Sequence, residues 1–228
     1  MAITAKDLGK KYQVGSGDLW PVRHMDMSIE KGVFVGITGR SGSGKSTLLK
    51  MLGGLLQPTE GNVEVDGRDI YALSERDMAR YRCDKVGFIF QDYFLEEMYT
   101  VYQNVEIVLM ISKVPVRERR ELIDQVLETV GMLHKKDTMV RNLSGGEKQR
   151  VCIARAIVNE PDILCADEPC GNLDRDNGQG IMRLLRAQVE QGKTVLLVTH
   201  NPEDAILTDE VITLQDGKII NHEFPGHS

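Results

Sequence analysis

The segment from Gly39 to Ser46 constrains this chain more than any other. Its order, Gly-Arg-Ser-Gly-Ser-Gly-Lys-Ser, fits the pattern G-x-x-x-x-G-K-[ST]. An apolar run from Val33 to Thr38 precedes it, and a stretch with helical character from Thr47 to Leu52 follows. A strand, a glycine-rich loop and a helix in this order cradle phosphate, because backbone N–H groups converge at a helix N-terminus. The sequence therefore predicts a nucleotide site.

We expect the whole loop and the next helical residue to contact phosphate. The candidate phosphate-binding residues are Gly39, Arg40, Ser41, Gly42, Ser43, Gly44, Lys45, Ser46 and Thr47. Lys45 is suited to the β- and γ-phosphates, and Ser46 offers a hydroxyl to Mg²⁺. The alternative is a glycine-rich turn that fits the pattern by accident. The flanking strand-like and helix-like segments argue against that alternative.

A second apolar run, Ile163 to Ala166, leads directly into Asp167 and Glu168. Ligands bind at the carboxyl edge of a parallel sheet, so these two carboxylates should lie beside the phosphate loop. Asp167 suits a Mg²⁺ ligand, and Glu168 suits a general base for the attacking water. The alternative is a helix-capping or turn acid. A third run, Thr194 to Thr199, ends at His200, which could reach the γ-phosphate in the same way.

The apolar runs are of strand length and do not alternate with polar residues, which is typical of buried parallel strands. A fourth run, Val86 to Phe90, joins them. Near the end, Val211 to Leu214 and Lys218 to Ile220 flank Asp216-Gly217 and predict a hairpin. We predict an α/β protein with a mostly parallel P-loop NTPase sheet, an N-terminal β region and an inserted helical lobe.

The middle of the chain, Asn104 to Val130, is helical in pattern, and Pro115 divides it in two. In its second half five apolar residues fall on one helix face, namely Leu122, Ile123, Val126, Leu127 and Val130. We expect one domain over 1–228, in which 1–92 and 143–228 form the P-loop core with its β region and 93–142 form a helical subdomain.

Composition excludes several classes of function. A net charge of -6 over 228 residues gives no reason to expect a nucleic-acid partner. The basic stretches Arg117 to Arg120 and Lys135-Lys136 are expected to be solvated helix faces. No apolar segment reaches the roughly 20 residues that span a bilayer, and residues 1–7 lack the basic and apolar regions of a signal peptide, so we expect neither feature. The cysteines show no CxxC spacing, so reduced thiols in a cytoplasmic protein are expected.

The segment from Leu143 to Arg150 opens another helix. Ser144 and Glu147 have the spacing of a capping box, and two glycines, Gly145 and Gly146, occupy the first turn. Glycines destabilise a helix but leave its N–H groups bare, which suits a second anion site. The alternative is simply a well-capped helix.

With this segment the chain resembles the nucleotide-binding subunit of an ATP-binding cassette (ABC) transporter, from Lys6 to about Ile220. Leu143 to Gln149 is similar to the signature motif of that family. Tyr12 resembles its adenine-stacking aromatic residue, and Gln91 resembles the glutamine that senses Mg²⁺. Gly171 to Asp174 resembles the D-loop, and His200 the switch histidine. Val33 and Cys170 depart from the usual Glu and from the usual Thr or Ser, and their functional meaning is left open.

The resemblance implies ATP and Mg²⁺ as cofactors. The implied metal-binding residues are Ser46, Gln91 and Asp167, and the implied catalytic residues are Lys45, Gln91, Glu168 and His200. It also implies a second copy of the chain, with ATP held between one phosphate loop and Ser144, Gly145 and Gly146 of the other copy. The transmembrane permease is implied to be a separate subunit, so the chain would lie on the inner face of the membrane.

Within the family, Leu52 to Leu55 and Asp167 to Asp174 are most similar to the branch of lipoprotein release, macrolide export and antimicrobial-peptide export. This favours export or extraction. The alternatives are a soluble, non-transport ABC ATPase and a regulatory subunit. An aromatic-rich segment after Gln91 is suited to contact the permease or to form lobe core; its residues are Tyr93, Phe94, Leu95, Met98, Tyr99, Val101 and Tyr102.

Overall fold

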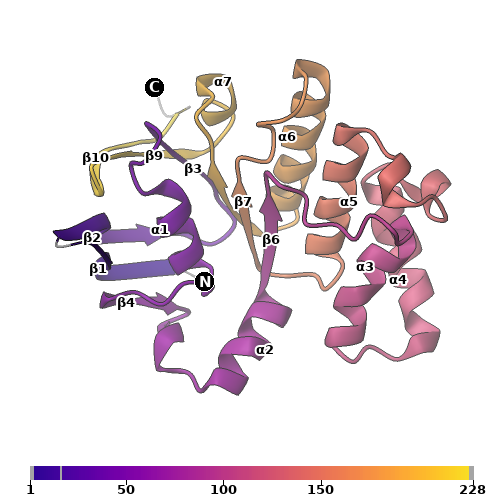
Figure 1. Cartoon of the computed structure of the whole chain (residues 1–228), viewed down its shortest axis with the longest axis horizontal. Helices are drawn as coiled ribbons and strands as arrows, with labels where there is room; N and C mark the ends of the chain where they lie inside the picture. Colours follow the sequence, from indigo (N-terminus) through magenta and orange to yellow (C-terminus); the bar gives the residue numbers. More distant parts are fainter. Residues whose placement is uncertain (1–2, 16, 226–228) are drawn as a thin grey trace.

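The computed structural model describes residues 3–15 and 17–225, which form two β-sheets with helices packed around them (Figure 1). The larger sheet has the strand order β10 (Lys218–Glu223), β9 (Glu210–Gln215), β3 (Phe34–Gly39), β8 (Thr194–Val198), β7 (Ile163–Asp167) and β6 (Val86–Phe90). Strands β9, β3, β8, β7 and β6 run parallel, and β10 pairs with β9 in antiparallel fashion. The predicted parallel sheet and the predicted C-terminal hairpin are confirmed.

The smaller sheet is antiparallel and has the order β2 (Gly17–Ile29), β1 (Ile3–Val14), β4 (Glu60–Val65) and β5 (Arg68–Asp69). It is the predicted N-terminal β region. Its two long strands keep pairing through three register shifts, which bend the ladder and increase its twist. The 3₁₀ turn η1 (Ile70–Ala72) and helix α2 (Glu75–Lys85) follow it and lead into β6.

Helices cover both faces of the six-stranded sheet. Helix α1 (Lys45–Leu52) and the smaller sheet cover one face, where Val35, Ile37 and Leu196 are fully buried. Helices α5 (Gly145–Ile157) and α6 (Arg175–Glu190) cover the other face over Leu164 and Leu197. Side chains alternate across a strand, so neighbouring residues serve different cores. Both cores are apolar, which explains why these strands show no alternation in sequence.

The remaining helices are α3 (Val101–Ile111), α4 (Val116–Thr129) and α7 (Pro202–Ala205), with 3₁₀ turns η2 (Leu133–Lys135) and η3 (Val140–Asn142). Helices α3 and α4 pack against α5, and their buried side chains continue the same apolar core that α5 shares with the sheet. Pro115 caps α4, so the predicted break is in place. Within the described residues, no helix combines the length and the apolar character that crossing a bilayer requires.

One sequence interpretation in this region is wrong in part. Arg117 and Arg120 are exposed as expected, but the Arg119 side chain is only 15% exposed and contacts Glu106 of α3. Lys135 and Lys136 do not form a solvated helix face either. Lys136 contacts Asp124 of α4 at 3.0 Å. Lys135, the last residue of η2, contacts Glu147 of α5. Sequence spacing could not reveal these pairs, because each joins elements that are separate along the chain.

Replacing Leu127 by Ala is expected to lower the free energy of unfolding by about 2–5 kcal/mol, because the Leu127 side chain is fully buried and its loss leaves a cavity. Denaturation with urea measures this difference. Glu128→Ala, at the exposed neighbouring position, serves as the control and should change it by less than about 0.5 kcal/mol. Equal effects of the two substitutions would contradict the packing described for α4.

Candidate nucleotide site

The phosphate loop connects β3 to α1 and depends on glycine backbone geometry. Gly39, Gly42 and Gly44 have φ values of 140°, 79° and 102°, a region that side chains disfavour. At Gly44 a Cβ atom would lie 1.8 Å from the carbonyl oxygen of Pro21 in β2. The close approach requires glycine at this position, and it places the smaller sheet directly against the loop.

Inside the loop lie two polar groups suited to an anion. Lys45 is only 7% exposed, and its Nζ donates to the carbonyl oxygens of Gly39 (2.9 Å) and Arg40 (3.1 Å). The buried hydroxyl of Ser43 has no hydrogen-bond partner among the described residues. Buried polar groups are normally paired. The ammonium group of Lys45 lies over its own loop, and the unpaired hydroxyl of Ser43 lies at a helix N-terminus. Both groups are suited to contact a bound phosphate.

Ser46 lies on α1, directly after the loop from β3, and it meets Asp167 of β7 although β3 and β7 are not adjacent. Strand β8 lies between β3 and β7, but α1 runs across the sheet and contacts both β7 and β8. The Ser46 hydroxyl therefore donates to Asp167 Oδ1 at 2.8 Å. Hydroxyl and carboxylate oxygens are ligands that Mg²⁺ prefers, so this pair fits the predicted metal position.

Glu168 and His200 form the second polar pair at this edge, with Nδ1 of the histidine 2.9 Å from Oε2 of the glutamate. Glu168 adopts a left-handed backbone, φ 48°, which is costly for a residue with a Cβ atom. Its N–H donates to the carbonyl of Val198, so β8 holds this conformation. Strained residues cluster at functional sites. A cavity of about 310 Å³ lies beside both side chains.

Two polar residues that the sequence did not single out brace the His200 loop. The hydroxyl of Thr199 donates to Asp204 at 3.3 Å and accepts the backbone N–H of Asn201 at 3.0 Å. Burial raises the pKa of the Asp204 carboxyl. The feature of the sequence that could have identified these two residues is a threonine at the end of a strand, followed by the short helix α7. A second cavity, of about 830 Å³, joins this loop to Gly39, Arg40 and Ser41.

Gln91 and Tyr12 lie at the edges of the site. Gln91 follows β6 and donates to the side chain of Asn172 at 3.3 Å, which links it to the segment after Glu168. The ring of Tyr12 is 41% exposed on β1, with Lys10 Nζ 5.4 Å from its centroid. Tyr12 pairs with Leu19, two residues before Pro21 in β2, so it lies on the part of the small sheet that supports the phosphate loop.

The N-terminus of α5 has the predicted capping box. The N–H of Ser144 donates to Glu147 Oε2 at 2.9 Å, and the Ser144 hydroxyl accepts the Glu147 N–H at 3.4 Å. The glycines there also have a packing role that the sequence did not reveal. A Cβ atom at Gly146 would lie 2.6 Å from the side chain of Asn177, and one at Gly145 would lie 2.9 Å from the hydroxyl of Tyr93.

The predicted site residues thus fall into two groups within one chain. The phosphate loop, Asp167, Glu168 and His200 come together at the carboxyl edge of the sheet. Helix α5 belongs to the other core, and Figure 1 shows α1 and α5 on opposite sides of β6 and β7.

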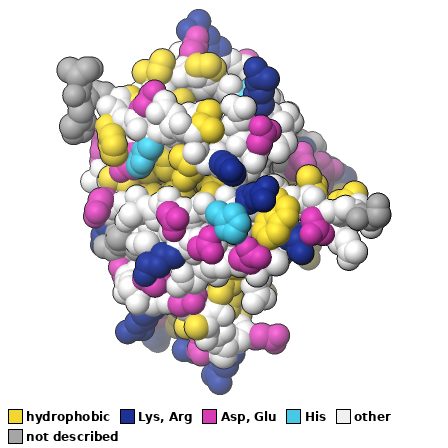
Figure 2. All heavy atoms as spheres, turned by 90° about the vertical axis from the view of Figure 1, so that its left-hand side faces the viewer, with side chains coloured by type: hydrophobic (Ala, Val, Ile, Leu, Met, Phe, Trp, Pro, Cys, Tyr) yellow, Lys and Arg dark blue, Asp and Glu magenta, His cyan; other side chains and the backbone are white. Residues whose placement is uncertain are grey.

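The face that bears the small sheet carries interspersed acidic and basic side chains (Figure 2).

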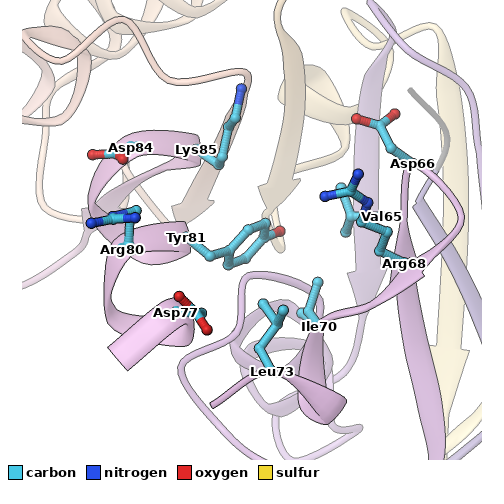
Figure 3. Close-up of a pocket in the computed structure, with 10 residues that line it drawn as sticks. All are labelled: Val65, Asp66, Arg68, Ile70, Leu73, Asp77, Arg80, Tyr81, Asp84 and Lys85. Atoms are coloured by element: carbon cyan, nitrogen blue, oxygen red, sulfur yellow. The ribbon is translucent and has the colours of Figure 1, made fainter. Parts of the chain in front are cut away.

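A third cavity, of about 510 Å³, lies between the small sheet and α2 and contains none of the predicted site residues (Figure 3). Tyr81 occupies its centre, and burial raises the pKa of the Tyr81 phenol. Arg68, Arg80 and Lys85 surround it together with Asp77 and Asp84. Charges of both signs at the rim leave this cavity without a preference for anionic ligands such as nucleotides.

The fold and the two polar pairs define a P-loop ATPase. The family model described as "ABC transporter" matches residues 22–171, and the chain belongs to this family. The predicted recognition is therefore confirmed, and the chain is an ATP-binding, ATP-hydrolysing subunit of this class.

Three similar proteins support this assignment. The chain is 39% identical to the lipoprotein-releasing system ATP-binding protein LolD of Pseudomonas fluorescens, with 96% of each chain covered. It is 38% identical to the macrolide export ATP-binding/permease protein MacB of Aggregatibacter actinomycetemcomitans, covering 96% of this chain and 34% of that protein. The dimeric post-hydrolysis structure of the ATP-binding cassette MJ0796, bound to ADP and Pi, superimposes with a TM-score of 0.91 at 35% identity, covering 99% of this chain and 100% of that chain. The predicted branch of the family is confirmed by the first two.

Proposed function

We propose that this chain powers export or extraction through a separate permease by closing with a second copy around ATP and Mg²⁺. The observation that carries the proposal is the meeting of Ser46 with Asp167 beside Lys45, at the edge where Glu168 and His200 also meet. A hydroxyl, a carboxylate and an ammonium group in this arrangement suit a metal-bound triphosphate.

The phosphates are held by the loop from Gly39 to Thr47, with Lys45 supplying the positive charge. Ser46 and Asp167 would hold Mg²⁺, with Gln91, the residue after β6, as the further ligand. Bound Mg²⁺ neutralises charge on the transferring phosphoryl group. Tyr12 stacks on the adenine. The exposed face of its ring and its place on the small sheet support that role.

Glu168 accepts the proton of the attacking water, and His200 orients the glutamate and the terminal phosphate. The 2.9 Å contact between them supports this division of roles. General bases must lie within hydrogen-bond reach of the group they deprotonate, and Glu168 opens onto a cavity large enough for water.

The second half of the nucleotide site comes from another copy of the chain, through Ser144, Gly145 and Gly146. Their helix end is separated from the phosphate loop of the same chain by the sheet, which supports contact in trans. The dimeric state of the similar cassette MJ0796 supports it as well. ATP then favours the closed pair because its γ-phosphate satisfies two helix ends at once.

The permease contacts the molecule at the start of residues 93–142, which we treat as a helical subdomain. After Gln91, three large apolar side chains are exposed: Phe94 by 69%, Met98 by 59% and Tyr99 by 45%. Val101 is fully buried, so the aromatic-rich segment divides between surface and core. Through this contact the chain lies peripherally on the inner face of the membrane.

Replacing Tyr99 by Ala is expected to reduce transport in cells several-fold while leaving the basal ATPase rate of the purified chain unchanged. The side chain is exposed, and the hydrogen bonds of Tyr99 among the described residues are made by its backbone, from its N–H to Glu96 and from the N–H of Val140 to its carbonyl. Met110→Ala, at an exposed apolar position near the end of α3, is the control and should affect neither activity. Equal loss of transport and ATPase in Tyr99→Ala would instead assign Tyr99 to the core of the lobe.

Isolation of the chain from native membranes tests the transport role. Recovery of a membrane-spanning subunit bound to the chain would support the proposal. Recovery with ribosomes or DNA would support a soluble, non-transport ATPase, and absence of phosphate release in any complex would support a regulatory subunit.

A further inference from the structure

Glu147 has two opposing effects at the N-terminus of α5. Its carboxylate accepts the Ser144 N–H and completes the capping box, and a negative charge in the first helical turn stabilises the helix. The same charge opposes the binding of an anion there. A helix N-terminus carries about half a positive charge, which one uncompensated carboxylate more than cancels.

Lys135 lies against this carboxylate. It ends the 3₁₀ turn η2, and its ammonium contacts Glu147 Oε1, while Glu147 uses Oε2 for the cap. Both side chains are about two-thirds buried, at 33% and 27% exposed, so water screens the pair only in part. The Lys135 contact lowers the pKa of Glu147, which therefore stays ionised and paired.

The lysine that follows Glu147 in α5 is already balanced by another carboxylate. Lys148, the next residue of α5, contacts Glu97 at 3.1 Å and is directed toward the segment after Gln91. The backbone of Lys135 is held in its turn by hydrogen bonds to Met132 and from Thr138. The cation beside Glu147 is thus supplied from a defined position outside the helix.

We propose that Lys135 is a positioning residue that neutralises Glu147, so that the N-terminus of α5 keeps its positive potential for the terminal phosphate of ATP bound to a second copy. This inference rests on the proposed ATP-bridged pair. It assigns a role to a residue outside every motif of the sequence.

The test uses Glu168→Gln as the parent, in which closed pairs should accumulate. The measurement is the ATP concentration that gives half-maximal dimer, by sedimentation velocity at low and high salt. Lys135→Met should raise this concentration about tenfold at low salt, the size expected for a partly buried charge at a helix end. The effect should shrink at high salt.

Rescue separates the electrostatic role from a merely structural one. Adding Glu147→Gln to Lys135→Met should return the ATP requirement to that of the parent, since glutamine also completes a capping box. Lys135→Arg should behave like the parent. Thermal midpoints without nucleotide, measured for each variant, identify any loss that comes from unfolding.

Two results would overturn the inference alone: a Lys135→Met variant that closes at the same ATP concentration as the parent, or a double variant that stays as weak as Lys135→Met. A parent that forms no dimer with ATP would defeat the proposed function itself, and this inference with it. The two failures are therefore distinguishable.

Discussion

Replacing Glu168 by Gln is expected to slow ATP hydrolysis by about 10²–10⁴-fold while ATP binding persists. The change removes the carboxylate that accepts the proton of water, and general bases typically contribute this factor. The amide keeps the shape of the side chain and a contact to His200. Phosphate release measures turnover, and gel filtration with ATP should show the closed dimer accumulating.

Glu203→Gln is the matched control, because Glu203 lies on α7, three residues after His200, and its exposed side chain pairs only with Arg175 among the described residues. Its turnover should equal that of the unmodified chain. A Glu168→Gln variant that stays monomeric with ATP would count against the ATP-bridged pair, and one that hydrolyses ATP normally would remove Glu168 from the reaction.

Replacing Lys45 by Ala is expected to weaken ATP binding about 10–100-fold and to abolish most turnover. The buried ammonium is the positive charge inside the phosphate loop, and hydrogen bonds to charged groups contribute about 1.5–3 kcal/mol. Equilibrium binding of a fluorescent ATP analogue measures the first effect and phosphate release the second.

Lys50→Ala is the control, because it shows whether the loss of any lysine from α1 would weaken ATP binding. Lys50 lies in the last turn of the same helix, away from the loop, and its loss should leave ATP binding within about twofold. Normal ATPase activity in Lys45→Ala would rule out the role of the phosphate loop.

The parts of the site that could be predicted from the sequence are those fixed by local order along the chain. Gly39 to Ser46 joins a buried strand to a helix, Asp167 ends the buried strand β7, and His200 lies two residues after the buried strand β8. Parallel strands end at one edge, so placing these residues together needed only the fold class. The capping box of Ser144 and Glu147 is local in the same sense.

The parts that escaped prediction depend on contacts between distant segments. Nothing near Gly146 in sequence indicates that Asn177 fills the space of its missing side chain. The pairing of Lys135 with Glu147 and the bracing of His200 by Thr199 and Asp204 likewise arise only after packing. The single-residue roles at the site are still predictions, and the substitutions above test the main ones.

The approach of Pro21 to Gly44 has a consequence for chimeric cassettes. Because the Pro21 carbonyl fills the space beside the loop, a replacement N-terminal sheet that shifts β2 by even an ångström would open a gap behind Gly44 or press on its backbone. Grafts that exchange this sheet between relatives should therefore be joined so that β2 and residues 39–46 come from the same parent.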